Sequence, residues 1–118
     1  MNYAVDSANM KLIDDYTVEK IKIPALLLME RAALHVAETM KGYLKKTDRI
    51  LVVCGPGNNG GDGIAAGRIL FLQGYRVAIL FPGDEAKTTP QTQTQLTIAR
   101  NLNMPFENTN KLREYNII

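Results

Sequence analysis

The feature that most constrains this chain is an apolar run that leads directly into a glycine-rich loop. Ile50 to Cys54 is continuously apolar, which predicts a strand that is buried on both faces. The loop that follows, Gly55-Pro-Gly-Asn-Asn-Gly-Gly-Asp-Gly63, has five glycines in nine residues. A helix from about Asp62 to Gln73 and a second buried strand from Arg76 to Phe81 come next. Strand, loop, helix and strand in this order predict an α/β fold with a parallel sheet and helices on both faces.

The other elements are predicted from helical periodicity, caps and turn residues. Before the glycine loop we expect one helix from Asp6 or Ser7 to Glu19 and a second helix that opens at Pro24. The apolar stripe of the second helix consists of Met29, Ala33, Val36, Met40 and Leu44. After the second strand we expect a turn, a polar helix, a short edge strand, a short helix and the start of another strand, at residues 82–84, 89–101, 104–106, 110–115 and 116–118.

Length and composition restrict the class of protein. A chain of 118 residues is long enough for one compact domain, and its 14 basic and 12 acidic residues give a net charge of only +2. A net charge this small does not indicate binding to nucleic acid or to an anionic membrane. Cys54 is the single cysteine, which fits a reducing compartment, and no apolar run is long enough to span a bilayer. The start of the chain lacks the pattern of a signal peptide, so we expect a soluble, cytosolic protein.

The glycine loop is suited to bind a ligand at the carboxyl end of the first strand. Glycine permits positive φ and lets a ligand approach the main chain, and the free N–H groups at the start of the next helix attract anions such as phosphate. Gly55-x-Gly57-x-x-Gly60 matches the dinucleotide fingerprint, which is a weak signal by itself, and the Gly-Lys-Ser/Thr of nucleotide triphosphatases is missing. A tight turn without a ligand is the structural alternative, but so many glycines cost conformational entropy.

Asp62 is unexpected in a loop that attracts phosphate, because its carboxylate would repel one. We interpret it as the N-cap of the following helix, worth about 1 kcal/mol, or as an acceptor for a ligand hydroxyl or nearby amides. Asn58 and Asn59 tolerate left-handed backbone, carry donors and acceptors, and offer an oxygen that suits a hard cation. The loop is therefore suited to a nucleotide-like ligand and could also hold a monovalent ion.

The loop, followed by Ala66 and Arg68, resembles the signature of the YjeF N-terminal domain family, the NAD(P)H-hydrate epimerases. Leu28-Met29-Glu30-Arg31-Ala32 resembles the second marker of the family, although Ala33 stands where glycine is usual. The resemblance covers nearly the whole chain. It implies a three-layer αβα Rossmann-like fold. It also implies the epimerisation of hydrated NADH and NADPH between their R and S forms, which is a step of nicotinamide nucleotide repair.

The resemblance further implies binding residues and partners. Substrate binding carries over to Asn58, Asn59, Gly60, Gly61 and Asp62, and a potassium ligand carries over to Asn59. In bacteria a dehydratase that repairs the S form is often fused at the C-terminus. Family members are commonly homodimers, and the apolar residues at the start of the second helix also favour self-association. Residues 26–29 are more apolar than one buried helix face requires, so we expect self-association through this helix.

The end of the chain departs from the family pattern. Family members continue from a strand like Tyr115-Asn-Ile-Ile118 into a stretch with a second potassium ligand, and their catalytic aspartate lies further on. We therefore interpret residues 1–118 as the N-terminal portion of a YjeF N-terminal domain, which binds substrate but does not catalyse by itself. Relatives often start the next helix with a Ser-x-Asp-Ala-like stretch, where this chain has Thr89-Pro-Gln-Thr92. The sequence leaves the effect of that change open.

Two other functions fit parts of the sequence. Some relatives with this fold serve as scaffolds in messenger RNA decapping, but the intact loop and the small net charge speak against such a module. An NAD-dependent oxidoreductase would need an acid at the end of the second strand to hold a ribose, and Asp84 lies near that place. Outside the loop, His35 is interpreted as a structural residue. Glu30 is either a surface ion-pair partner or an acid that holds loop amides.

Overall fold

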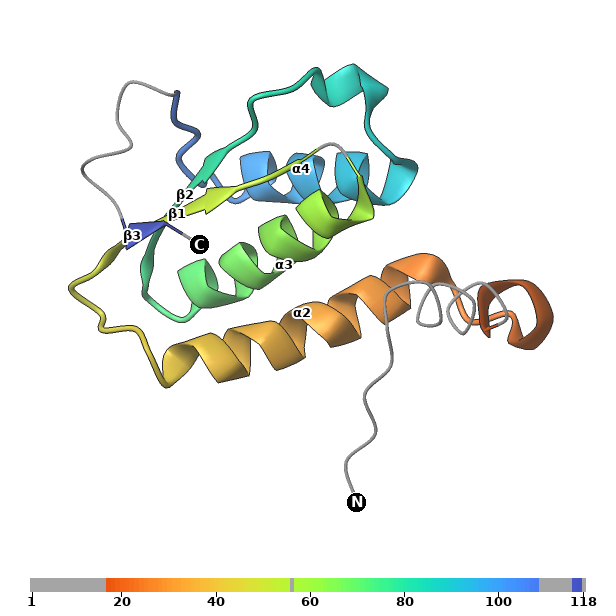
Figure 1. Cartoon of the computed structure of the whole chain (residues 1–118), viewed down its shortest axis with the longest axis horizontal. Coiled ribbons are helices and arrows are strands. Elements are labelled where there is room, and N and C mark those ends of the chain that lie inside the picture. The colour runs from red at the N-terminus through yellow and green to blue at the C-terminus, as the bar shows by residue number, and fades with distance from the viewer. Residues whose placement is uncertain (1–16, 56, 109–115, 118) are drawn as a thin grey trace.

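The computed structural model describes residues 17–55, 57–108 and 116–117 of the chain. Its α-helices are α2 (Ala25–Lys41), α3 (Asn58–Leu72) and α4 (Pro90–Asn101), and its strands are β1 (Arg49–Val53), β2 (Arg76–Leu80) and β3 (Asn116–Ile117) (Figure 1). A short π-helical turn, η1 (Thr17–Ile21), precedes α2, and a 3₁₀ turn, η2 (Glu85–Lys87), precedes α4. The helix expected at 6–19 lies mostly outside the described residues, and the one expected at 110–115 lies entirely outside them.

The strands form one parallel sheet in the order β2–β1–β3. β1 and β2 pair in register along their whole length, and β3 pairs with the first half of β1 on its other side. Beyond β2, Phe106 forms a parallel bridge with Ile79, whose amide donates to the carbonyl of Pro105 at 2.8 Å. The parallel sheet and the edge pairing near residues 104–106 are thus confirmed.

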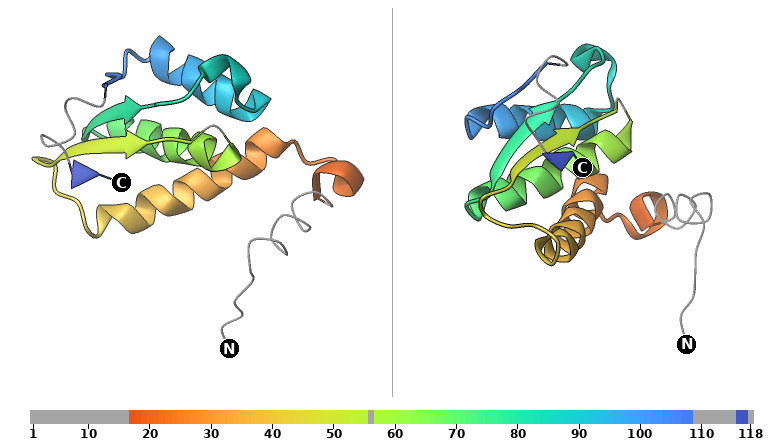
Figure 2. Two further views of the ribbon diagram at one scale, coloured as in Figure 1. Left: turned by 45° about the horizontal axis from the view of Figure 1, so that its top comes forward. Right: turned by 60° about the vertical axis from the view of Figure 1, so that its left-hand side comes forward.

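One face of the sheet carries the main core. Side chains alternate between the two faces of a strand, and Ile50 and Val52 of β1 and Val77 and Ile79 of β2 are buried in one cluster with α3 and α4. The helix α3 lies between α2 and α4 in every view (Figures 1 and 2). The opposite face of the sheet carries a separate, smaller cluster of buried side chains, which consists of Leu51, Ala78 and Leu80.

Two glycines let α3 lie directly on this sheet. A Cβ atom at Gly67 would lie 3.0 Å from Cγ2 of Val52 and 3.4 Å from Cγ1 of Val77, and one at Gly63 would lie 3.3 Å from Cγ1 of Val52. Close packing on the sheet therefore explains a glycine in mid-helix that costs about 1 kcal/mol in helix propensity. The chain leaves α3 through Gly74, whose φ of 94° is in the left-handed region, as the sequence predicts.

The helix α2 packs on α3 through a narrow stripe of mostly small side chains. Its buried residues are Met29, Ala33 and Ala37, and Met40 packs at the edge of the core. Val36 is 41% exposed, so its predicted place in the stripe is wrong. After Ala33 the next buried residue of the helix is Ala37, four positions later, rather than Val36, three positions later.

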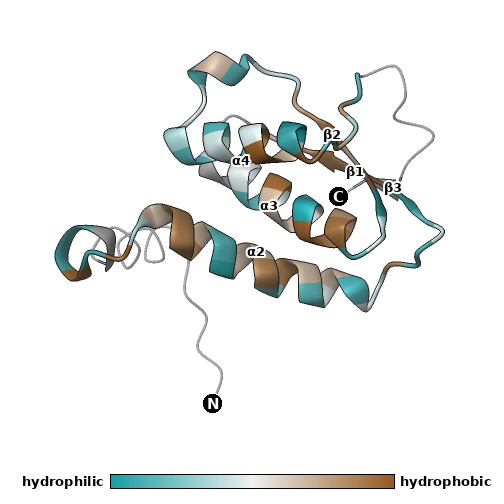
Figure 3. Ribbon diagram, turned by 180° about the vertical axis from the view of Figure 1, so that it is seen from behind, coloured by the Kyte–Doolittle hydropathy of each residue, from teal (hydrophilic) through white to brown (hydrophobic). Residues whose placement is uncertain are grey.

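Several apolar side chains on and before α2 are exposed. Exposed apolar side chains on and before this helix are Ile21, Ile23, Leu26, Leu27, Leu34 and Val36. Figure 3 shows the apolar colouring along α2, most clearly in its first turns. Of residues 26–29, on which the expected homodimer depends, Leu26 and Leu27 are exposed, Leu28 is half-buried and Met29 is buried, and the homodimer stays a prediction. Among the described helices, none is both long enough and apolar enough to cross a membrane.

We predict that Cys54 does not react with thiol reagents while the protein is folded. Its side chain is buried just after β1, and this burial raises the pKa of Cys54 to about 12. The reactive thiolate is therefore nearly absent at pH 8, whereas a thiol in the unfolded chain has a pKa of about 8.5. Labelling with a chromogenic disulfide reagent should be slow in buffer and fast in urea, with Cys54→Ala as the blank. Fast labelling of the folded chain would contradict the prediction.

Candidate functional site

The glycine loop leaves β1 at the carboxyl end of the sheet. Because β2 and β3 lie on opposite sides of β1, the strand order reverses at β1, and α/β sheets bind ligands at such switch points. Both α3 and α4 begin at this end, which is on the right in Figure 1. The positive ends of two helix dipoles therefore lie at the same end of the molecule, which favours an anionic ligand there.

The helix α3 begins at Asn58, four residues before its predicted start. Its N-cap is Gly57, with φ of −83° and ψ of −171°, and no side chain caps this end. The amide of Gly60 donates to the carbonyl of Gly57 at 3.1 Å and closes the first turn. The interpretation of Asp62 as the N-cap is therefore wrong: this residue lies in the second turn of α3, where its side chain is half-buried.

The five predicted binding residues are brought together as the first five residues of α3, from Asn58 to Asp62. Gly60 and Gly61 are buried. A Cβ atom at Gly60 would lie 1.9 Å from the carbonyl oxygen of Gly55, which no side chain could tolerate. Within the described residues, Gly74 is the only glycine with a positive φ. Gly60, Gly61 and Gly63 therefore serve close approach rather than left-handed backbone.

Two other helices support the loop. A Cβ atom at Gly61 would lie 2.7 Å from Oγ1 of Thr92 in α4 and 2.8 Å from Cε of Met29 in α2. Thr92 is fully buried, and its hydroxyl donates to the carbonyl of Gly57 at 3.0 Å. No local sequence pattern indicates this contact, because the two residues lie 35 positions apart.

A second buried polar side chain lies one turn further along α4. Gln95 is 1% exposed and its Nε2 donates to Sδ of Met29 at 3.7 Å. Its Oε1 is buried and has no hydrogen-bond partner among the described residues. Gln95 therefore bonds to Met29 of α2, whereas Thr92 bonds to the loop itself.

Glu30 and Arg68 connect α2 with α3. The guanidinium of Arg68 donates to the carboxylate of Glu30, and the side chains are 13% and 38% exposed, respectively. Of the two interpretations of Glu30, the ion pair is therefore confirmed. His35 is exposed on α2 and lies outside the glycine loop.

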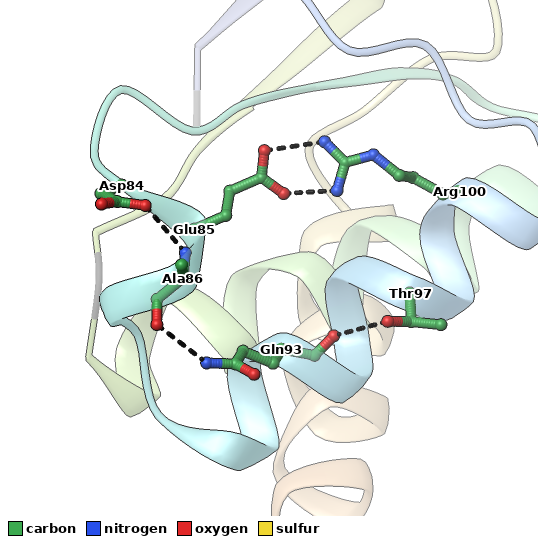
Figure 4. Close-up of polar contacts among 6 residues, drawn as sticks. All are labelled: Asp84, Glu85, Ala86, Gln93, Thr97 and Arg100. Atoms are coloured by element: carbon green, nitrogen blue, oxygen red, sulfur yellow. Dashed lines mark hydrogen bonds and ion pairs between the residues drawn. The ribbon is translucent and has the colours of Figure 1, made fainter.

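The segment after β2 is fastened to α4 (Figure 4). Asp84 caps η2 by accepting from the amide of Ala86 at 2.9 Å. Glu85 accepts two hydrogen bonds from Arg100, and these bonds hold the pKa of Glu85 below its usual value. Nε2 of Gln93 donates to the carbonyl of Ala86 at 3.3 Å. Asp84 therefore has a local structural role, which weakens the oxidoreductase alternative that needs it for a ribose.

Comparisons with known proteins agree with this geometry. A family described as "YjeF-related protein N-terminus" matches residues 25–117. Two proteins named NAD(P)H-hydrate epimerase are similar to the chain: one from Weissella koreensis is 39% identical over 100% of this chain, and one from Oenococcus oeni is 44% identical over 97%. The crystal structure of a yeast protein, YNL200c, matches with a TM-score of 0.75 at 25% identity over 93% of this chain. These matches confirm the expected α/β fold with a parallel sheet.

The chain spans about half the length of the proteins that it matches. It covers 54% of the Weissella protein, 55% of the Oenococcus protein and 49% of the yeast chain. The part of these proteins that the chain matches contains the glycine loop and the strands and helices around it.

We predict that Gly60→Ala destabilises the fold by about 1–3 kcal/mol, because its methyl group would collide with the main chain at Gly55. Gly55→Ala is the matched control, since a Cβ atom there meets nothing within 4 Å and the backbone needs no positive φ. This control should be neutral or slightly stabilising. Urea unfolding measures both free energies. Equal stability of the two variants would contradict the close approach.

Proposed function

Because this chain belongs to the YjeF N-terminal domain family, we propose that it supplies the dinucleotide-binding half of an NAD(P)H-hydrate epimerase. The proposed reaction interconverts the R and S forms of hydrated NADH or NADPH. The observation that carries the proposal is the position of the glycine loop, which leads from the carboxyl end of β1 into α3 at the point where the strand order reverses. The similarity to proteins named as this epimerase supports it.

In this proposal the main chain of the loop binds the ligand. The first amides of a helix have no partner within the helix, so those at the start of α3 are suited to the diphosphate of the dinucleotide. Gly60 and Gly61 hold this helix start close to Gly55, Thr92 and Met29. The carboxylate of Asp62 would accept a hydrogen bond from a ribose hydroxyl.

Epimerisation also needs a group that transfers a proton near the nicotinamide ring. Within the loop the titratable side chain is that of Asp62, and Glu30 is held by Arg68. We propose that the acid or base of the reaction lies beyond Ile118, in the half of the relatives that this chain does not span.

Asn59 is our proposed ligand for a potassium ion. Its amide oxygen is a hard, neutral donor of the kind that such cations prefer, and Asp62 supplies a negative charge three residues later on α3. A bound cation would offset part of the charge of the diphosphate.

The test uses ADP-ribose and the two isomers of hydrated NADPH. We expect the 118-residue chain to bind ADP-ribose in a calorimetric titration and to leave the exchange of the R and S isomers, followed by chromatography, at its spontaneous rate. Asp84→Asn should bind ADP-ribose like the unchanged chain, whereas an oxidoreductase site would lose affinity. Absence of binding would contradict the proposal. Epimerisation well above the spontaneous rate would assign the proton transfer to Asp62 or Glu30.

We predict that Asn59→Ala weakens ADP-ribose binding in potassium chloride and removes the difference between potassium chloride and tetramethylammonium chloride. The free energy of unfolding should change by less than about 1 kcal/mol, because Asn59 lies in the first turn of α3 and alanine is a better helix former than asparagine. Asn101→Ala, at the exposed last residue of α4, is the control and should keep the potassium response. An unchanged potassium response in Asn59→Ala would remove Asn59 from the cation site.

A further inference from the structure

Two hydroxyl groups at the start of α4 form a short relay that ends on the glycine loop. The hydroxyl of Thr89 donates to Oγ1 of Thr92 at 3.0 Å and accepts from the amide of Thr92 at 3.3 Å. The hydroxyl of Thr92 then donates to the carbonyl of Gly57 at 3.0 Å. Hydrogen bonds in such a chain polarise and strengthen one another. The stretch Thr89 to Thr92, whose role the sequence left open, is thus the contact between the starts of α4 and α3.

The carbonyl of Gly57 and the amide of Asn58 belong to the same peptide plane. Because a trans peptide bond is planar, a hydrogen bond that fixes the carbonyl also fixes the direction of the N–H group on the other side. Gly57 is the N-cap of α3 and no side chain caps this helix. The bond from Thr92 is therefore the side-chain hydrogen bond that holds the N-cap peptide, and it comes from another helix.

The surroundings of Thr92 leave its hydroxyl little freedom. The residue is 0% exposed, and Gly61 passes so close that a Cβ atom there would lie 2.7 Å from Oγ1. The carbonyl of Gly57 also accepts from the amide of Gly60 at 3.1 Å, so the same acceptor is held from within α3 and from α4. Exchange of the Gly60 amide with solvent is therefore a local measure of how firmly this carbonyl is held.

We propose that Thr92 is the positioning residue of the dinucleotide-binding loop. Its hydroxyl sets the orientation of the Gly57–Asn58 peptide and thereby aims the first free amide of α3 at a phosphate of the ligand. This role rests on the proposed function, because it assumes that the loop binds an anionic dinucleotide.

The experiment compares Thr92→Val, which replaces the hydroxyl by a methyl group of similar size, with Thr92→Ser, which keeps the hydroxyl. Thr97→Val is the matched control, because this substitution is on the same helix and removes a hydroxyl that donates to the carbonyl of Gln93. Hydrogen exchange of the Gly60 amide and calorimetric affinity for ADP-ribose are measured on the 118-residue chain, with thermal unfolding to normalise for global stability.

We expect Thr92→Val to speed exchange at Gly60 and to weaken ADP-ribose binding, each by about threefold to tenfold, which corresponds to one net hydrogen bond. Thr92→Ser and Thr97→Val should remain close to the unchanged chain. Unchanged exchange at Gly60, unchanged affinity, or a Thr92→Ser variant as weak as Thr92→Val would overturn the proposal. If the unchanged chain does not bind ADP-ribose, the proposed function fails. Exchange at Gly60 then decides by itself whether Thr92 positions the loop.

Discussion

The rest of this structure depends on how closely α3 lies against β1 and the loop that precedes the helix. Gly60, Gly63 and Gly67 are spaced by three and four residues, so they lie on one face of α3. Cβ atoms at these positions would lie 1.9 Å from the oxygen of Gly55, 3.3 Å from a methyl of Val52 and 3.0 Å from its other methyl, respectively. The glycine-rich sequence is therefore first a packing requirement, which places the start of a helix directly after the end of a central strand.

This arrangement removes the usual local supports of a helix start. Glycine costs about 1 kcal/mol per residue in a helix, and Gly57 offers no capping side chain. Contacts from the neighbouring helices hold this segment: Thr92 bonds to the carbonyl of Gly57, and Met29 packs where a side chain of Gly61 would be. The position of the start of α3 therefore depends on residues of α2 and α4.

Local sequence patterns predict most of the helices and strands. The predicted bounds are wrong where contacts between residues far apart in sequence determine the structure. The strands β1 and β2 can be predicted from their continuous apolar runs, because a buried parallel strand needs apolar residues on both faces. The start of α3 is predicted four residues late because Asp62 is a good N-cap and glycine is a poor helix former. At the observed start, Thr92 bonds to the carbonyl of the N-cap Gly57, and these partners are too far apart in sequence for any local pattern to show the contact.

The position of Asp62 bears on which ligand the loop can prefer. A carboxylate in the second turn of α3 cancels part of the positive potential of the helix start, so a site for phosphate alone would be stronger with a neutral residue there. An ionised carboxylate is an acceptor only, so it can bind a hydroxyl group but repels a phosphate. On the proposed function, the amides before Asp62 bind the diphosphate and Asp62 binds a ribose hydroxyl beside it. The acid then favours a nucleotide over inorganic phosphate, which has the charge that the helix attracts but no sugar to offset the repulsion.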